Sequence, residues 1–322
     1  MPGQNVPPPP PAAGVRLAWE ALPAELRTAV EAWLGEPVVS AISQAGGFSP
    51  GVAARLLTAS GRRVFLKAVG AELNADSPRF HRREIAIAAA LPAHTPAPRL
   101  LWSYDRDGWV ALIFEDIAGV QPQQPWRADE LARVLDALND LAMALTPSPL
   151  PPTIAVRARD SGLINGAWWA RVRRDASPGL DTWSARHLDE LIALEALAPA
   201  ATDGDTLQHF DVRADNVLLT PERVYVVDWP HAQIGAPWLD LVGMAPSVAM
   251  QGGPEPEALL RDQPVLRGVA PAALDAFIAL IAGYFTWSAL QPPPPGIPTV
   301  RAFQDAQGVV ARRWLAKRRG WD

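Results

Sequence analysis

The stretch that decides the fold is HFDVRADN, residues 209–216, which is followed at once by the apolar run VLL. Asp211 and Asn216 stand five positions apart, and the strand-like run VYVVD ends in Asp228 twelve residues later. Two interpretations compete: a polar turn rich in Asp and Asn, or a site that holds a metal and a reacting hydroxyl. Oxygen atoms of Asp and Asn suit Mg²⁺, whereas zinc would need more His or Cys than this region supplies. If the stretch binds a metal, Mg²⁺ is the better prediction.

Composition indicates a folded protein without a nucleic-acid-binding face. The chain has 322 residues, 49% hydrophobic and 20% charged, which is enough for a large core and two domains or lobes. A net charge of -5 argues against a nucleic-acid partner. Cysteine is absent, so disulfides and thiolate chemistry are excluded. The N-terminus lacks signal-peptide features, and no stretch approaches the ~20 apolar residues of a membrane span. We therefore expect a cytoplasmic protein without a membrane partner.

The first ~120 residues predict an antiparallel sheet with one helix against it. Residues 1–13 are rich in proline and should form a mobile, polyproline-like tail. Apolar periodicity and turn residues then predict, in chain order, a helix over 22–35, strands over 52–59 and 63–69, a helix over 80–91, and strands over 99–104 and 109–117. After the first helix, the expected order is β-β-α-β-β.

The rest of the chain predicts mainly helices. Helical patterns cover 130–145 and 184–200, with a segment containing Trp168 and Trp169 between them. After the opening stretch come two short strands, within 216–219 and 224–229, and then helices to the C-terminus. The proline-rich run 291–298 interrupts those last helices as a stiff loop.

The run GGFSPG, residues 46–51, is a glycine-rich loop between strand-like segments. Its spacing fits neither the dinucleotide fingerprint nor a P-loop, and a strand follows it where those motifs need a helix. Such a loop can still fold over phosphates and offer backbone N–H groups. Most glycine turns between strands are only turns, so the loop alone decides little.

Lys67 lies in the strand after this loop and shares a face with Phe65 and Val69. It is either an edge lysine that reaches water or a lysine held under the loop to pair with phosphate. The second interpretation needs an acid to fix the ammonium group. Glu84, 17 residues later on the following helix, is the candidate.

The order of these features resembles the kinase-like aminoglycoside phosphotransferase family, from about Val38 to Leu241. The shared features are the glycine loop, the strand lysine, the helix glutamate, H-x-D-x-x-x-x-N and a strand ending in Asp. The resemblance implies an α+β, bilobal, protein-kinase-like fold. Its N-lobe, 14–117, would be an antiparallel β-sheet with one main helix, and its C-lobe, 118–322, would be mostly α-helical.

The resemblance also implies ATP and Mg²⁺ as cofactors and gives each motif a role. Asp211 would be the catalytic base, and Asn216 and Asp228 would be the Mg²⁺ ligands. His209 and Asp240 would brace the catalytic loop. Backbone groups of FEDI, residues 114–117, would hold the adenine. The nucleotide-binding set would be Gly47, Phe48, Ser49, Lys67, Glu84, Glu115 and Ile117.

Two residues depart from the family's pattern: Phe210 stands where Gly is common, and Arg213 where His is common. Arg213 either reaches the γ-phosphate or forms a salt bridge nearby, and we favour the salt bridge. After Asp228 the chain reads WP, and no Ser, Thr, Tyr or closing A-P-E follows before Asp240. These differences favour a small-molecule acceptor over a protein.

The nature of that acceptor stays open at this point. Residues 160–205 hold eight acids against four Arg, which either line a pocket for a polycation or form a solvated helix face, and the helix face is favoured. Tryptophans either build the core or form flat walls for a ligand. Those in question are Trp168, Trp169, Trp183, Trp229, Trp238 and Trp287.

Three functions remain in competition. The favoured one is an ATP- and Mg²⁺-dependent phosphotransferase acting on a hydroxyl of a small molecule, either an antibiotic such as an aminoglycoside or a metabolite. The alternative is a kinase-like nucleotide-binding protein without phosphotransfer activity. A metal-dependent hydrolase using Asp211, Asp228 and His231 is disfavoured, because the glycine loop and the Lys67–Glu84 pair would then be idle.

Overall fold

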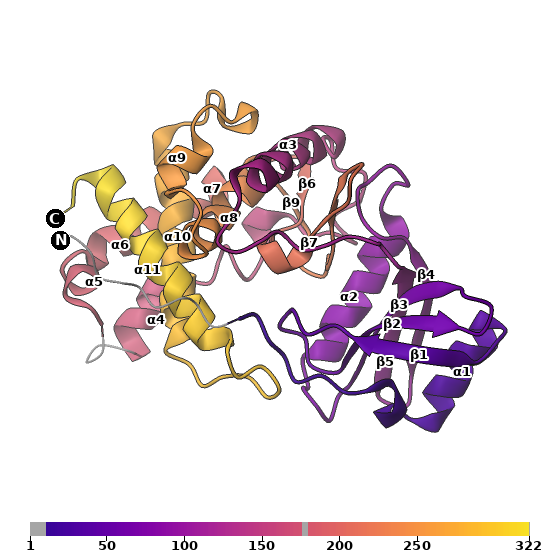
Figure 1. The fold of residues 1–322 in the computed structure, drawn as a ribbon. Coiled ribbons are helices and arrows are strands. Elements are labelled where there is room, and N and C mark those ends of the chain that lie inside the picture. Colours follow the sequence, from indigo (N-terminus) through magenta and orange to yellow (C-terminus); the bar gives the residue numbers. More distant parts are fainter. Residues whose placement is uncertain (1–10, 176–179, 322) are drawn as a thin grey trace.

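The computed structural model describes residues 11–175 and 180–321. An antiparallel sheet forms the N-terminal part and a mostly helical body forms the C-terminal part (Figure 1), so the predicted α+β class is confirmed. Residues 1–10 of the predicted tail lie outside the described residues. Residue Ala13 pairs with Gly47 in an isolated parallel bridge. The tail's last residues are therefore placed against the glycine loop.

The N-terminal sheet has five strands in the order β1-β2-β3-β5-β4, and each neighbouring pair is antiparallel. The predicted order lacked β1, an edge strand whose half-exposed sequence VVSAIS has no clear apolar alternation. The elements are α1 (Ala24–Leu34), β1 (Val38–Ser43), β2 (Val52–Thr58), β3 (Arg63–Gly70), α2 (Ser77–Ala90), β4 (Leu100–Arg106) and β5 (Trp109–Glu115), after the 3₁₀ turn η1 (Trp19–Ala21).

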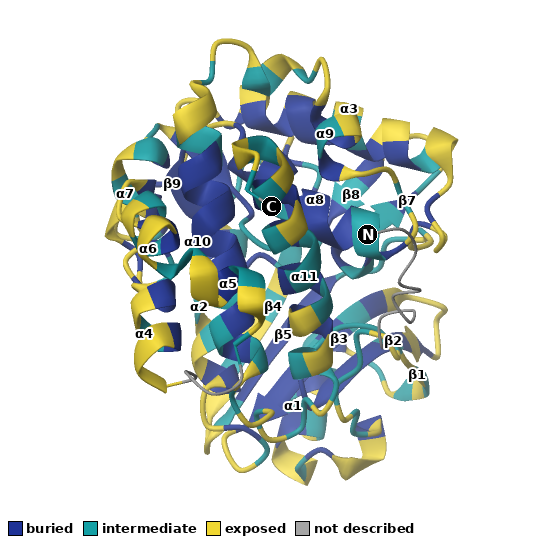
Figure 2. Cartoon of the chain, turned by 90° about the vertical axis from the view of Figure 1, so that its left-hand side faces the viewer, coloured by how far each residue is buried: buried dark blue, intermediate teal, exposed yellow. Residues whose placement is uncertain are grey.

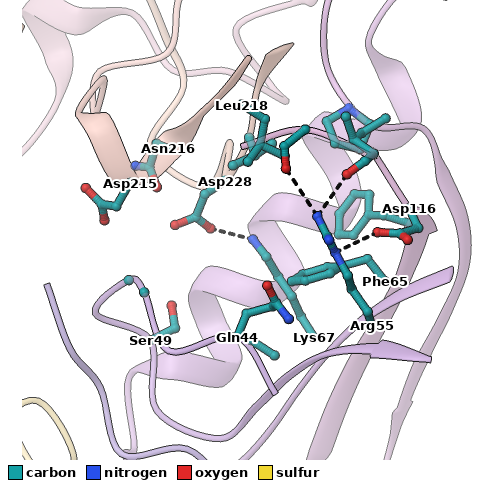
Figure 3. Close-up of a pocket in the computed structure, with 18 of the residues that line it drawn as sticks. Gln44, Ser49, Arg55, Phe65, Lys67, Asp116, Asp215, Asn216, Leu218 and Asp228 are labelled. Carbon is teal, nitrogen blue, oxygen red and sulfur yellow. Dashed lines mark hydrogen bonds and ion pairs between the residues drawn. The ribbon is translucent and has the colours of Figure 1, made fainter. Parts of the chain in front are cut away.

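The two faces of this sheet pack against different helices, as alternation along β3 predicts. Val64 and Leu66 belong to the core that includes Val30 of α1. Phe65 packs instead with Ile85 of α2 and with Val110, Leu112 and Phe114 of β5. Lys67 therefore lies on the α2 face of the sheet, which is the face turned toward the rest of the protein (Figures 1 and 3).

The C-terminal part holds most of the helices and four short strands. Strands β6 and β9 pair with each other, as do β7 and β8. Strands β6 and β9 were not predicted, because each becomes a strand by pairing with a segment more than 20 residues away, whereas β7 and β8 pair across a short turn. The elements are α3 (Ala128–Ala144), α4 (Trp168–Asp175), α5 (Thr182–Arg186), α6 (Leu188–Glu195), α7 (Ala198–Ala201), β6 (Thr206–Gln208), β7 (Val217–Leu219), β8 (Val224–Val226), β9 (Gln233–Gly235), α8 (Leu239–Met250), α9 (Pro256–Leu260), α10 (Pro271–Ala289) and α11 (Val300–Arg319), with 3₁₀ turns η2 (Ala158–Asp160), η3 (Ala214–Asn216) and η4 (Pro264–Leu266).

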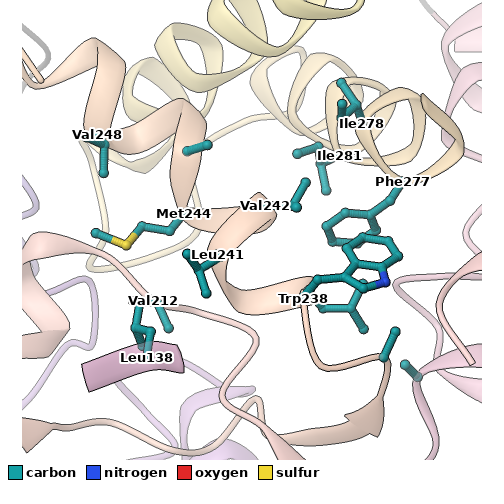
Figure 4. Packing of buried hydrophobic residues seen from close by; sticks show 14 of the residues in the cluster. Leu138, Val212, Trp238, Leu241, Val242, Met244, Val248, Phe277, Ile278 and Ile281 are labelled. Carbon is teal, nitrogen blue, oxygen red and sulfur yellow. The ribbon is translucent and has the colours of Figure 1, made fainter. Parts of the chain in front are cut away.

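Helix α10 is the central helix of the C-terminal core (Figure 2). Phe277 meets Trp238 edge-on, with ring centroids 5.5 Å apart, beside Val242 and Ile281 (Figure 4). Among the described residues, α10 is also the one helix long and apolar enough to cross a membrane by length and composition. The expectation that no stretch approaches the apolar length of a membrane span was wrong for this helix. The stretch was overlooked in the sequence because Asp275 interrupts its apolar run. Most of this helix is buried inside the protein.

The lobe boundaries predicted at 14–117 and 118–322 remain a proposal. Val120 already pairs with Leu219 of β7, with both backbone N–H groups donating at 2.7–3.0 Å. The chain thus joins the C-terminal part within a few residues of the proposed boundary.

Candidate active site

A cavity of about 490 Å³ lies between the two parts of the molecule (Figure 3). The glycine loop contributes Gly46, Gly47 and Ser49 to its wall, and the opposite side contains Asn216 and Asp228. Its size falls in the range of ligand-binding cavities. The loop, the strand lysine and the predicted metal ligands are therefore gathered around one space.

Lys67 lies in this cavity between two carboxylates. Its Nζ donates to both oxygens of Glu84, at 2.7 and 2.9 Å, and to Oδ1 of Asp228 at 2.6 Å. Burial opposes the ammonium charge, but Asp228 and Glu84 outweigh it and raise the pKa of Lys67. The predicted Lys67–Glu84 pair exists, and Asp228 shares the same ammonium group.

Asn216 and Asp228 present oxygen atoms to the cavity. Asn216 Nδ2 donates to the backbone oxygen and to Oδ2 of Asp211, at 2.8 and 3.2 Å, which leaves its own amide oxygen free to bind a cation. Mg²⁺ takes few protein ligands and completes its shell with phosphate oxygens and water, so this donor set fits Mg²⁺.

The donor set offers little to other metal chemistry. No cluster of three or more His, Cys, Asp or Glu suited to a metal occurs in the part of the chain that the structure describes. His231 packs against Phe80, with ring centroids 5.1 Å apart. This arrangement gives no support to the metal-dependent hydrolase.

Asp240 and His209 hold the backbone of the loop formed by residues 209–216, which the resemblance identifies as the catalytic loop. The carboxylate of Asp240 accepts the N–H groups of His209 and Phe210, both at 2.7 Å. His209 Nε2 lies 2.9 Å from the oxygen of Val227, and its Nδ1 accepts the N–H of Asp211 at 3.2 Å. Burial lowers the pKa of His209 to about 4 and raises that of Asp240 to about 6. Both residues thus hold the backbone of residues 209–211, and their role in bracing a catalytic loop stays a prediction.

Phe210 has a φ of 65°, in the left-handed region that glycine adopts without strain. This explains why glycine would suit the position. The two hydrogen bonds to Asp240 hold the backbone N–H groups of His209 and Phe210 in place, and the Phe210 side chain packs on the C-terminal core.

Arg213 bridges two aspartates in the catalytic loop. Its guanidinium contacts Oδ1 of Asp211 and pairs with both oxygens of Asp215, at 2.9 and 3.0 Å. Burial alone would lower the pKa of Arg213, but Asp211 and Asp215 raise it. Arg213 does not line the first cavity. The salt-bridge interpretation therefore fits better than a γ-phosphate contact, and Asp215 gains a partner that the sequence did not suggest.

The inner wall of the cavity contains the FEDI segment. Glu115 and Ile117 line it, as predicted for residues around an adenine. Arg55 of β2 donates to the oxygen of Ile117 at 3.0 Å and pairs with Asp116 at 3.0 Å, so it ties this segment to the sheet (Figure 3). Phe48, predicted in the nucleotide-binding set, does not line this cavity.

Arg16 is a residue of this site that sequence reasoning missed. Its Nε donates to the oxygen of Gln44 at 3.0 Å, and its terminal nitrogens contact the oxygens of Gly46 and Ser49. The guanidinium is thus inserted among the carbonyls of the glycine loop. No motif surrounds Arg16 in the sequence, so only the folded chain brings it to the loop.

A second cavity, of about 350 Å³, adjoins the first and shares Asp228 with it. Asp211 and Arg213 open into this second cavity, and Phe48 lines it with its ring 5.1 Å from that of Phe303. Residues 160–205 contain the eight acids, and of the described residues in this range, 160–175 and 180–205, only Leu163 lines it. The solvated-face interpretation is the better one for the seven exposed acids, whereas Glu195 is buried.

The tryptophans belong to the core and do not line this second cavity. None of the six singled out in the sequence lines it, within the described ranges 11–175 and 180–321. Trp169 is fully buried, and its Nε1 donates to the oxygen of Ala279 in α10 at 2.8 Å. Trp229 lines the first cavity instead.

Comparisons with known proteins agree with this arrangement. Among solved structures, a thermostable mutant of the aminoglycoside phosphotransferase APH(4)-Ia, in a complex with ADP and hygromycin B, is 18% identical, with a TM-score of 0.60, over 92% of this chain and 99% of that one. A GDP complex of an aminoglycoside 2'-phosphotransferase-IIIa mutant is 16% identical, with a TM-score of 0.61, over 92% and 97%. A choline/ethanolamine kinase family protein from Mesorhizobium loti is 19% identical, with a TM-score of 0.59, over 91% and 94%. These likenesses show the shared kinase-like fold.

A search of curated proteins found no match. The sequence model of the phosphotransferase enzyme family, however, matches residues 43–307. That range includes the glycine loop, Lys67, the catalytic loop and Asp228, and it covers most of the chain. The chain belongs to the phosphotransferase enzyme family.

Proposed function

We propose that this protein transfers the γ-phosphoryl group of ATP to a hydroxyl group of a small molecule. The observation that carries the proposal is the position of Asp228, which borders both cavities. Lys67 lies on its nucleotide side and Asp211 opens into the other cavity. A phosphoryl group at this junction would have a donor on one side and an acceptor on the other.

In the reaction, the bond between the γ-phosphorus and the bridging oxygen breaks, and ADP leaves with that oxygen. A new bond forms from the acceptor's hydroxyl oxygen to phosphorus, and Asp211 accepts or orients the hydroxyl proton. Lys67 binds the α- and β-phosphates, while the glycine loop offers N–H groups to the same phosphates. Asn216 and Asp228 would hold Mg²⁺, which neutralises charge on the phosphates when bound.

The test is ADP release with Mg-ATP over a panel of hydroxylated compounds, comparing the parent protein with Asp211→Ala. Loss of a general base costs about 10²- to 10⁴-fold in rate, so the variant should lose compound-dependent turnover. Asp205→Ala is the matched control, because Asp205 pairs with Arg157 in an exposed salt bridge away from both cavities. Turnover that survives in Asp211→Ala refutes the assignment of the base.

A kinase-like binding protein without activity is the second candidate. It retains support if the chain binds Mg-ATP tightly but no compound in the panel gives turnover. The intact set of Lys67, Asp211, Asn216 and Asp228 favours the enzyme.

A further inference from the structure

Under the proposed function, the cavity that Asp211 opens into is the acceptor site. Most of its wall is aromatic or aliphatic, from the glycine loop, the catalytic loop and helices α10 and α11. The apolar side chains include Phe48, Phe210, Phe277, Ile281, Phe285 and Phe303. A wall of this kind stabilises an apolar ligand surface by removing it from water.

The carboxylates near the reaction point are already engaged. Asp211 contacts Arg213, and Asp228 pairs with Lys67. Asp240 is buried, and its two oxygens each accept a backbone N–H group. A cationic ligand would have to displace a guanidinium or an ammonium group from these acids, which costs the existing ion pair.

One further acid, Asp76, lines the same cavity. It is exposed and stands at the N-cap position of α2 without a side-chain capping hydrogen bond, where the helix dipole favours a negative charge. The acid-rich segment 160–205 contributes none of its carboxylates to the wall. A polycationic aminosugar would therefore find one exposed carboxylate where it needs several.

The aromatic rings do not form an open cage for a single cation either. The Arg213 guanidinium carbon lies 5.3 Å from the ring centroid of Phe48 and 6.0 Å from that of Phe303. A ring face covered by guanidinium has already made its cation–π contact. Arg213 thus takes the place that a ligand ammonium group would occupy at these two rings.

Neutral polar groups complete the wall. Gln307 of α11 is 5% exposed, and its amide takes part in no hydrogen bond among the residues that the structure describes. Gln304 beside it accepts from Arg301 at 2.9 Å and faces the Tyr284 hydroxyl at 3.5 Å. The Gln307 amide is not among the fully buried side-chain atoms that lack a partner, so it reaches the water of the cavity, and a ligand group can replace that water.

We propose that the acceptor is an uncharged molecule with a largely apolar body, whose hydroxyl or carbonyl groups hydrogen-bond to the Gln307 amide. The hydroxyl to be phosphorylated points toward Asp211, and the apolar body packs on the phenylalanines of α10 and α11. A polyamine-like sugar is the wrong class for this cavity.

The test is calorimetric binding to the full chain loaded with Mg²⁺ and a non-hydrolysable ATP analogue. The probes are neutral macrolactones, phenolic glycosides and nucleosides, with kanamycin as the polycation and choline as the single cation. At least one neutral probe should bind 10-fold more tightly than kanamycin and choline, with affinity that changes less than 2-fold from 50 to 300 mM salt. Tighter, salt-sensitive binding of kanamycin or choline overturns the inference, and so does failure of every neutral probe.

Variants connect that binding to the cavity. Gln307→Leu keeps the side-chain volume and should lower the affinity for the best neutral probe about 5- to 10-fold. Gln291→Leu, outside both cavities, should leave that affinity unchanged. An unchanged affinity in Gln307→Leu removes the amide from the proposal. Failure of the proposed function is distinguishable, because no compound of any charge would then give turnover with Mg-ATP, whereas failure of this inference alone leaves turnover with a charged acceptor.

Discussion

Replacing Arg16 by alanine should loosen the glycine loop. The side chain contacts the carbonyl oxygens of Gln44, Gly46 and Ser49, with Gly47 at 3.4 Å. Hydrogen bonds to charged groups contribute about 1.5–3 kcal/mol each when buried, but these carbonyls regain water once the arginine is gone. We therefore take about 0.7 kcal/mol for each of the three shorter contacts, which makes the loss of loop-ordering free energy about 2 kcal/mol.

If the nucleotide has to order the loop, the net binding free energy of ATP becomes weaker by this amount. About 2 kcal/mol corresponds to a KM for ATP that is roughly 30-fold higher, with a smaller change in kcat. Arg16→Lys keeps the charge but cannot span three carbonyls, so its KM for ATP should lie between those of the parent protein and Arg16→Ala. Arg62→Ala, which removes an arginine stacked on Trp33 outside the cavity, is the control.

The assay is steady-state ADP release with varied ATP, together with thermal unfolding of each variant. A KM within 2-fold of the parent value in Arg16→Ala would refute the reasoning. If the unfolding temperature falls and the KM does not move, Arg16 stabilises the fold without ordering the loop for the nucleotide.

Three further perturbations test other parts of the molecule. Lys67→Ala should lower kcat/KM for ATP by about 10²- to 10³-fold, measured against Lys317→Ala, the chain's other lysine, and equal kinetics would rule out the phosphate contact. The folded protein keeps the His209 ring neutral down to its pKa of about 4, whereas the unfolded chain protonates near 6.5, so stability falls as pH drops through that window, by about 3 kcal/mol at most. Urea unfolding of His209→Gln at pH 7 and 4.5 should show a shallower pH dependence than the parent, and a parallel pair of curves would contradict this. Glu195→Gln should cost about 1–3 kcal/mol of unfolding free energy, because Glu195 accepts two buried backbone N–H groups at the start of α4, and an unchanged denaturation midpoint would show that the amide replaces it fully.

The sequence predicted most of the fold because strands β2 to β5 and the longer helices carry clear apolar periods. It also named Lys67, Glu84 and Asp228, which the chain brings within hydrogen-bonding distance. Short strands such as β6 were missed because pairing with a distant segment, and not local pattern, makes them strands. Arg16 escaped for the same reason: its partners lie about 30 residues away and are backbone oxygens, which leave no mark on the sequence.

Phe48 shows a different limit of sequence reasoning. Its position within the glycine loop predicted a nucleotide contact, yet its ring turns to the other cavity and meets Phe303 of α11. Backbone and side chain of one loop residue can face different spaces, and spacing rules describe the backbone alone. The same ring lines the proposed acceptor site, so a residue that the sequence assigned to one substrate lies at the cavity proposed for the other.

Two of the cations between the two parts of the molecule are each shared by two carboxylates, whereas Arg16 contacts backbone carbonyls and Arg55 pairs with Asp116. The groups are Lys67 with Glu84 and Asp228, and Arg213 with Asp211 and Asp215. Each group of one cation and two acids is left with a negative charge, and burial together with Asp228 raises the pKa of Glu84 against the pull of Lys67. A nucleotide would add more negative charge beside these groups, which supports the proposed binding of Mg²⁺ by Asn216 and Asp228 together with the phosphates. The uncharged acceptor proposed above would leave that balance undisturbed.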